Sequence, residues 1–490
     1  MNFRERLVRG SVLIFSSSVA TFLLSLAKSI TVARLLNDPE AIGLLGIVAS
    51  LSGIFGTAAA FGIPVAIARY VASFQADPGE ASARLVRTSL AMAAILSLIS
   101  GFAMFVLSPV LAVNLYNRPE LTPLLQVGAG YVAASAIVAV LLGVVRGSHR
   151  MGRLAALTVG QAASVLFASL VLVIMYGIAG AVYALFLGAS VIAVLAAASA
   201  AHSMSAFGIS LRGRITRKAV ADVTRYAGPV LASGLVTYPT IWIVETFVAL
   251  RLSVHDLGLY RIGYGFYNLL VTVPAVLAVP LMPLVAELSE RSPDRLKETF
   301  SRLLRVLLLA ILPVSVGIAL AARPLLSFLF GDVYADADLL TSVLVLAALF
   351  VALAPATGSI FLGSGRAMTV LAIDIVWSIL FIPMTFAFVE TIGLIGVAVA
   401  HLAVRFIILL LTLGFLRKEF GVRIAPFLPP ILLSLGGAGL VVGIVFGLPR
   451  GIAPLFAGPV AAALALAAYR FLSAEERSLL IASIRDIAKR

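Results

Sequence analysis

"GSHRMGRL" at residues 147–154 returns as "GSGRAMTV" at residues 363–370, an offset of 216 residues. At the same offset, "YGIAGAVYA" (176–184) is matched by "IGLIGVAVA" (392–400). No insertion or deletion separates the two matches, because Arg150 and Gly177 are as far apart in sequence as Arg366 and Gly393. A long internal repeat in a hydrophobic chain is typical of a transporter whose halves move against each other.

Composition identifies the class of protein. Of the 490 residues, 61% are hydrophobic and 12% charged, whereas a soluble domain has roughly 25% charged residues. We therefore expect an integral membrane protein with short loops. The chain has no cysteine, and its four histidines lack metal-ligand spacing, so we expect no metal site and no cofactor. The net charge of +14 is explained by basic cytoplasmic loops, and we expect no nucleic-acid partner.

Hydropathy predicts an all-α protein of about fourteen transmembrane helices, since each crossing needs about 20 mostly apolar residues. The first helix follows Arg4, Arg6 and Arg9 without a cleavage site, so we interpret it as retained. The predicted spans are 10–33, 41–62, 85–108, 121–145, 154–176, 179–201, 226–250, 259–285, 303–322, 338–361, 367–389, 393–416, 428–447 and 452–472. The glycine turns of the repeat join two of these pairs into antiparallel hairpins.

The repeat predicts two pseudo-symmetric lobes of six helices and two additional C-terminal helices. "ARLLNDPEAIGLLGI" after the first helix resembles "ALRLSVHDLGLYRI" after the seventh, which supports this division. The predicted parts are an N-terminal lobe (1–202), a cytoplasmic linker (203–225), a C-terminal lobe (226–418) and the last two helices with a tail (419–490).

The distribution of lysine and arginine predicts the orientation. With the N-terminus inside, 28 of the 36 basic residues fall in inner segments, 5 in outer segments and 3 within spans. Basic residues collect on the cytoplasmic side. We therefore expect a multi-pass protein of the cytoplasmic membrane with both termini in the cytoplasm.

The first predicted helix has a polar face, formed by Ser11, Ser18, Thr21, Ser25 and Lys28. Hydroxyl groups alone are typical of helix packing. Lys28 is different because a charge within the membrane is costly unless it meets water or a partner. Lys28 either faces a polar cavity or extends to the outer surface.

The eighth predicted helix has a second polar face, formed by Arg261, Tyr264, Asn268 and Thr272 at steps of 3, 4 and 4. Pro274, Pro280 and Pro283 interrupt this helix, and interrupted helices in membranes usually line a cavity. We predict that Arg261 faces the same cavity as Lys28. Arg34 and Arg251 occupy matching points of the two halves and either surround its outer mouth or anchor the helices at the interface.

Ionisable residues of the C-terminal half form a second candidate set, for ion coupling. Glu245 shares a helix face with Tyr238 and Trp242, and the other members are Asp374, His401 and Arg405. The repeat places Thr158, Leu185 and Ala189 opposite the last three, so these charges belong to one half only. One interpretation is a structural Asp374–Arg405 pair; the other is a proton or sodium site built on Glu245 and Asp374.

No catalytic motif is present, and no glycine-rich phosphate loop with its lysine occurs. Asp332, Asp336 and Asp338 form an acidic outer segment that we interpret as a solvated loop. The chain is therefore not expected to be an enzyme, although a membrane-embedded polymerase or glycosyltransferase is a further alternative.

Three stretches carry a resemblance to the polysaccharide-type lipid flippases of the MOP superfamily, which also contains the lipid II flippase and the MATE drug exporters. They are "ITVARLLNDPEAIGLLGI", "LGLYRIGYGFYNLLVTVPAVLAVPLMPLVAEL" and "GSGRAMTVLAIDIVWSILFIPMTFAFVETIGLIGVAVAHLAVR". The resemblance extends over essentially the whole chain.

The resemblance implies alternating access and a lipid-linked oligosaccharide as cargo, with a cationic cavity that binds the diphosphate. It assigns Lys28, Arg34 and Arg261 to that cavity and Arg69 as a further candidate; Arg251, Tyr264 and Asn268 complete our candidate cargo site. Expected partners are the lipid-linked oligosaccharide, membrane lipids and glycan-assembly enzymes. The alternative is a MATE-like drug/cation antiporter, whose cavity is typically acidic.

Overall fold

The structure is a computed structural model that describes residues 3–76, 78–210, 213–278, 293–449, 451–472 and 477. These residues form α-helices joined by short 3-10 and π-helical turns, and no strand occurs among them. The described chain is divided into two compact units, Met1–Gly258 and Leu259–Arg490.

The elements that begin in the first unit are α1 (Phe3–Leu36), α2 (Pro39–Ala60), α3 (Ile63–Ala76), α4 (Glu80–Pro109), η1 (Val110–Leu115), α5 (Leu121–Gly147), α6 (Met151–Ala206), α7 (Arg217–Arg251) and α8 (Val254–Ala278). Only the start of α8 lies in the first unit.

The elements that begin in the second unit are α10 (Pro293–Leu320), α11 (Ala322–Leu329), η2 (Asp332–Ala337), α12 (Asp338–Val351), α13 (Ala354–Gly363), α14 (Ala367–Ile392), α15 (Ile395–Phe420), η3 (Ala425–Phe427), α16 (Leu428–Gly447), η4 (Ala453–Phe456) and α17 (Ala457–Phe471). The rest of α8, from Leu259, belongs to this unit.

The predicted number of transmembrane helices is confirmed. Among the described residues, 12 helical segments are long and apolar enough to cross a membrane. One of them, α6, contains two helices, because Gly177 has φ 55° and ψ −131° inside it. The remaining predicted helix, at 259–285, corresponds to α8. Pro280 and Pro283 lie outside the described residues, whereas Pro274 is buried within α8.

The glycine turns of the repeat have the same backbone geometry in both halves. Gly393 has φ 66° and ψ −145°, close to the angles of Gly177, and a side chain at either position would be strained. Three residues later, a Cβ atom on Gly180 would lie 1.8 Å from the Leu172 carbonyl oxygen, and one on Gly396 would lie 2.3 Å from that of Phe388. The helices of each hairpin therefore approach closely at equivalent points.

The "GSxR" segments also adopt the same turn. His149 has φ 53° and its counterpart Gly365 has φ 75°. The Ser148 amide donates to the Val144 carbonyl at 2.9 Å, and the Ser364 amide donates to the Ile360 carbonyl at 3.1 Å. A residue with left-handed φ ends α5 and α13 in the same way.

The first unit includes α7, which the repeat assigned to the C-terminal lobe at 226–418. The physical reason is close packing between α7 and α2. A Cβ atom on Gly53 would lie 2.7 Å from the Tyr238 ring, and one on Gly234 would lie 2.6 Å from the Thr57 methyl group. The boundaries predicted from the repeat thus differ from the compact units, and the division into lobes stays a prediction.

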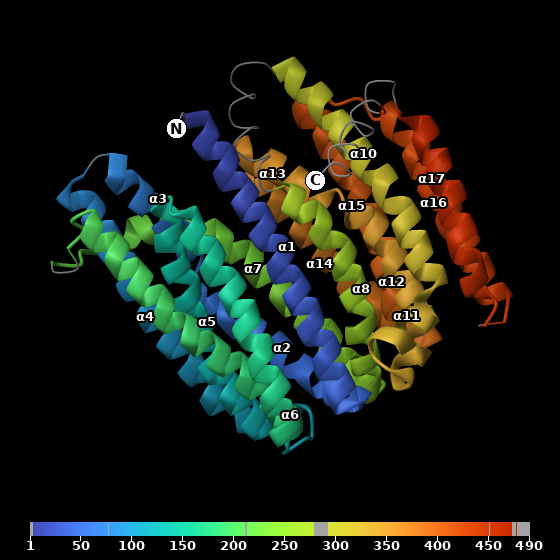
Figure 1. The fold of residues 1–490 in the computed structure, drawn as a ribbon, viewed down its shortest axis with the longest axis horizontal. Helices are drawn as coiled ribbons and strands as arrows, with labels where there is room; N and C mark the ends of the chain where they lie inside the picture. The colour runs from blue at the N-terminus through green and yellow to red at the C-terminus, as the bar shows by residue number, and fades with distance from the viewer. Residues whose placement is uncertain are drawn as a thin grey trace. The chain divides into compact units, whose positions relative to one another are not determined.

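Within the first unit, α1 lies along α6, as Figure 1 shows. The α1 hydroxyl groups bond largely to their own helix: Ser18 donates to the Ile14 carbonyl at 2.8 Å and Ser29 to that of Ser25 at 3.0 Å. Such bonds satisfy a serine without a polar partner on another helix. The side chain of Ser11 lies outside the described residues.

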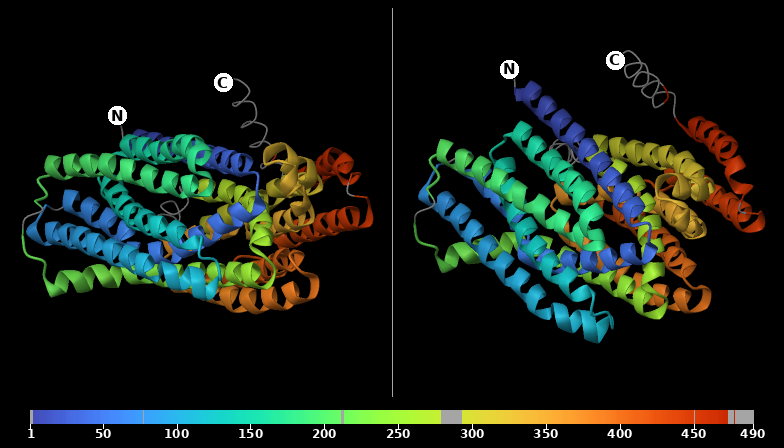
Figure 2. Two further views of the ribbon diagram at one scale, coloured as in Figure 1. Left: turned by 90° about the horizontal axis from the view of Figure 1, so that it is seen from below. Right: turned by 60° about the horizontal axis from the view of Figure 1, so that its bottom comes forward.

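Within the second unit, α12 is the central helix and is buried over almost its whole length. It packs against α10 and α15, while α16 and α17 pack on α10 (Figure 2). The two additional C-terminal helices therefore extend the second unit at α10.

Candidate functional site

The open face of α8 carries the polar residues that its sequence pattern predicted. Arg261, Tyr264 and Thr272 are half-buried and Asn268 is exposed, whereas residues on the other face of the helix, such as Phe266 and Tyr267, are buried. A Cβ atom on Gly265 would meet nothing within 4 Å. The helix is therefore open at Gly265 and Asn268, while Arg261 and Tyr264 are partly covered.

The predicted cations of the first unit differ in their surroundings. Lys28 is half-buried in α1, and Arg34, in the last turn of the same helix, is exposed. Arg251 is the exposed last residue of α7. Arg69 is exposed on α3, and its guanidinium carbon lies 4.5 Å from the ring centre of Tyr226 on α7. Arg69 therefore has an aromatic partner within its own unit.

Glu245 is a buried acid in the first unit, with only 1% of its surface exposed. It lies on α7 beside a small polar network. The Tyr116 hydroxyl shares a hydrogen bond with Thr246 Oγ1 at 2.7 Å, and Trp242 Nε1 donates to the same hydroxyl at 3.1 Å. This network joins α7 to the end of η1 and holds the helix face that contains Trp242 in place.

His401 is the centre of a cluster in the second unit. The ring is 2% exposed, and its Nε2 atom shares a hydrogen bond with the Tyr260 hydroxyl at 3.0 Å. Its ring centre lies 4.3 Å from that of Phe381, 5.5 Å from that of Tyr267 and 5.6 Å from that of Tyr264. The cluster therefore joins α8, α14 and α15 through aromatic contacts.

Arg405 lies one helical turn after His401 and belongs to the same cluster. Its guanidinium carbon lies 4.7 Å from the ring centre of Trp377. The charge of Arg405 is thus stabilised by the face of the Trp377 ring. Asp374 is half-buried on α14, and the proposed Asp374–Arg405 pair stays a prediction.

The structure brings Tyr264, His401 and Arg405 into one cluster, although their sequence patterns predicted a cargo site for Tyr264 and ion coupling for the other two. Tyr260, Tyr267, Trp377 and Phe381 were missed as site residues. Their spacing contains a signal: tyrosines at i, i+4 and i+7 on α8, and bulky aromatic residues at i and i+4 on α14. In a membrane protein this signal is hard to separate from ordinary apolar packing.

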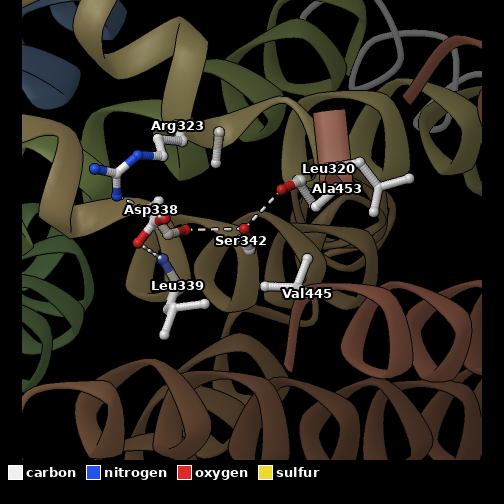
Figure 3. A pocket seen from close by; sticks show the side chains of 9 residues that line it. Leu320, Arg323, Asp338, Leu339, Ser342, Val445 and Ala453 are labelled. Atoms are coloured by element: carbon white, nitrogen blue, oxygen red, sulfur yellow. Dashed lines mark hydrogen bonds and ion pairs between the residues drawn. The ribbon is translucent and has the colours of Figure 1, made fainter. Parts of the chain in front are cut away.

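The interpretation of residues 332–338 as a solvated acidic loop is wrong for one of its three aspartates. Asp332 and Asp336 are exposed, as expected of a solvated loop, but Asp338 is buried. As Figure 3 shows, Asp338 accepts a hydrogen bond from the Leu339 amide at 2.8 Å and faces Arg323 Nη1 at 3.4 Å. Asp338 therefore begins α12 and binds Arg323 instead of facing solvent.

The same carboxylate lines a pocket formed by α10, α11, α12, α16 and η4. Ser342 Oγ, which also lines it, donates to the Ala319 carbonyl at 2.6 Å (Figure 3). Val445 and Ala453 complete the lining. These polar groups satisfy one another, so we assign the pocket a structural role. In the described ranges, no three histidine or acidic side chains are grouped as a metal site would require.

Comparison with solved structures identifies the fold as that of the MOP superfamily transporters. The lipid II flippase MurJ, in an inward-closed conformation, is 16% identical with a TM-score of 0.72, covering 96% of this chain and 100% of that one. A multidrug resistance MATE family transporter of the MOP superfamily, in an inward-facing conformation, is 18% identical with a TM-score of 0.70, covering 84% and 98%.

A third similar structure is a MOP superfamily transporter from Pyrococcus furiosus, described as having a binding pocket of reverse polarity. It is 18% identical with a TM-score of 0.62, covering 85% of this chain and 96% of that one. No curated protein matched the chain. At these identities the structural comparisons establish the fold alone.

The family follows from the sequence match. The family model described as "Polysaccharide biosynthesis protein" matches residues 31–338, which is more than half of the chain. The chain therefore belongs to this family of polysaccharide biosynthesis proteins and has the helical fold of MOP transporters.

Proposed function

We propose that the chain is a flippase that moves a lipid-linked oligosaccharide across the cytoplasmic membrane by alternating access. The observation that carries the proposal is the family match at residues 31–338, supported by the MurJ-like fold. Polysaccharide assembly on a lipid carrier needs a transporter that brings the assembled unit to the other side. Both termini are then cytoplasmic, and glycan-assembly enzymes act before and after this step.

The proposed cargo site uses the polar face of α8. Arg261 carries a permanent positive charge at the start of that face, and Tyr264 and Asn268 follow at one-turn intervals. Guanidinium groups bind phosphates through paired hydrogen bonds. In this proposal Arg261 and Lys28 bind the diphosphate, Asn268 and Tyr264 contact the sugar, and Arg34 and Arg251 attract the anionic cargo. No enzymatic step and no cofactor is involved.

The proposed coupling site uses Glu245, Asp374, His401 and Arg405. Burying an acid such as Glu245 within a membrane costs free energy, and such acids are commonly retained for ion binding. Proton or sodium binding at these residues would bias the transporter between its conformations.

A cellular assay tests the proposal. In cells that depend on this protein for a surface glycan, Lys28→Ala and Arg261→Ala abolish glycan assembly while the protein still reaches the membrane. Arg417→Ala serves as the control, because Arg417 is an exposed arginine in the last turn of α15. Normal assembly in both test variants would contradict the cargo-site assignment.

The second candidate function is MATE-like export of drugs or other organic cations, which the fold match with the MATE transporter and the buried Glu245 favour. Proteoliposomes distinguish the two functions. Movement of a polyprenyl diphosphate oligosaccharide, without uptake of a fluorescent organic cation, supports the flippase; the reverse result supports the exporter.

A further inference from the structure

Two basic segments of the first unit lie at the same end of α6. Because α6 turns back on itself at Gly177, the segments before and after it meet. The Arg150 guanidinium carbon, before α6, lies 5.9 Å from the ring centre of Phe207, after it. We call the exposed cations of these two segments the basic end surface; its members are Arg146, Arg153, Arg214, Arg217, Lys218 and Arg225.

The charge of the basic end surface is not neutralised by neighbouring acids. In the described residues of the first unit, the ion pairs of Glu80, Glu40 and Glu120 go to other arginines, and none of the six cations has an ion pair. From residue 203 to residue 226 the sequence contains five basic residues and one acid, Asp222. The surface therefore has an excess of positive charge.

The linker between α6 and α7 is held on α4 by a buried arginine. Arg87 is 4% exposed, and its Nη1 atom donates to the Ser210 carbonyl at 3.1 Å. A Cβ atom on Gly213 would lie 2.6 Å from the same guanidinium carbon. Ile209 is buried in the hydrophobic core of the unit. The cations at 214–218 therefore follow an anchored segment and are presented at a defined place.

The repeat indicates that the fold does not require this charge. At the offset of 216, a leucine and a threonine occupy the positions that Arg146 and Arg153 have in the first half. The turn of the second half keeps only Arg366, and its Nη1 atom lies 2.7 Å from Glu419 Oε2. The same turn thus forms without the excess charge, which is particular to the first half.

Phospholipid headgroups are the anions that suit this surface. Both α6 and α7 are long and apolar enough to cross a membrane, so the short linker between them lies at the level of the headgroups. Ile215 is 51% exposed between Arg214 and Arg217. An apolar side chain among cations is typical of segments that lie in the membrane interface. Clusters of lysine and arginine beside a membrane helix attract anionic lipids.

We propose that the basic end surface binds the headgroups of anionic phospholipids, with Arg214, Arg217 and Lys218 as the main contacts. Their guanidinium and ammonium groups bind the headgroup phosphate, and Ile215 enters the boundary between headgroups and acyl chains. The bound lipids hold the linker on the membrane surface. Lipid binding here does not depend on which cargo the chain transports.

Native mass spectrometry of the full-length protein in neutral detergent measures this binding, with phosphatidylglycerol or phosphatidylcholine added. We expect the parent to bind phosphatidylglycerol about tenfold more tightly, because only this headgroup has a net negative charge. In the triple variant Arg214→Gln/Arg217→Gln/Lys218→Gln, we expect the preference to fall to about twofold or less.

The matched control is Arg417→Gln/Lys418→Gln/Arg423→Gln, which removes the same charge from three exposed residues of the second unit. We expect it to keep the preference of the parent. An unchanged preference in the test variant would overturn the proposal. An equal loss in both variants would also overturn it, because net charge alone would then explain binding.

Inorganic phosphate distinguishes a lipid surface from a site for a free anion. When phosphate is added at the concentration of the lipid, we expect bound phosphatidylglycerol to stay bound, because several cations and the apolar contact of Ile215 act together on the lipid. Displacement of the lipid by phosphate would contradict the assignment to phospholipid headgroups.

Discussion

The hairpin inside α6 and the hairpin of α14 and α15 have the same turn geometry but differ in the side chains between their helices. Both turn at a glycine with nearly the same φ and ψ, at Gly177 and Gly393. In the first hairpin the helices pack through a small residue, because a Cβ atom on Gly188 would lie 2.5 Å from the Val165 side chain. In the second, Val404 and Phe381 occupy these positions and Arg405 replaces Ala189. Larger side chains therefore replace this close contact in the second hairpin, where the His401 cluster lies.

This difference separates scaffold from function. The turns and close approaches recur in both halves, so they follow from folding requirements that both halves share. The His401 cluster exists in one half only, so the fold does not require it.

The largest effect on stability is expected when an arginine is introduced into the first hairpin at the position equivalent to Arg405. Ala189 is 1% exposed, and Ala189→Arg would place a cation there without the aromatic partners of Arg405. We expect a loss of about 4 kcal/mol in the free energy of unfolding, measured by denaturation in detergent. Ala189→Ser is the control for a small polar change. A stability equal to that of the parent would show that the first hairpin also accommodates charge.

Adding a methyl group at the shared close approach should damage both hairpins. Gly180→Ala and Gly396→Ala each place Cβ against backbone atoms, and we expect each to cost about 3 kcal/mol. The controls are Gly160→Ala and Gly414→Ala, whose Cβ atoms would have ordinary or no contacts. Thermal unfolding of the four variants checks the prediction. If only one of the two test variants is destabilised, the hairpins are not equivalent scaffolds.

A smaller effect is expected from the hydrogen bond between Tyr260 and His401. Tyr260→Phe and His401→Leu, together with the double variant, measure the coupling energy between the two side chains. We expect coupling of about 1 kcal/mol, because both rings are buried and share one hydrogen bond. Additive effects of the two single variants would contradict a functional unit built on this bond.

The repeated turns and close helix contacts were predictable from the sequence, for physical reasons. Gly177 and Gly393 are required by positive φ, and Gly180 and Gly396 by lack of space, so the repeat preserves them. The fourteen helices followed from the length of apolar runs. The α8 polar face was also predictable, since Arg261, Tyr264 and Asn268 share one side of a helix at helical spacing.

The His401 cluster was only partly predictable. Its charged members were visible as departures from the repeat, but Tyr260, Trp377 and Phe381 resemble lipid-facing or core residues until three helices are assembled. The partner of Arg69 was not predictable either, because Tyr226 is 157 positions away in the sequence. Contacts between side chains on helices that are far apart in the sequence depend on tertiary packing, which hydropathy does not predict.

If the polar face of α8 binds an anionic lipid-linked sugar as proposed, the purified protein binds this cargo through Arg261. The affinity for a polyprenyl diphosphate oligosaccharide is measured for the parent, Arg261→Gln and the control Arg417→Gln. We predict that Arg261→Gln binds at least about tenfold more weakly, while the control binds like the parent. Equal affinity of all three proteins would contradict the account.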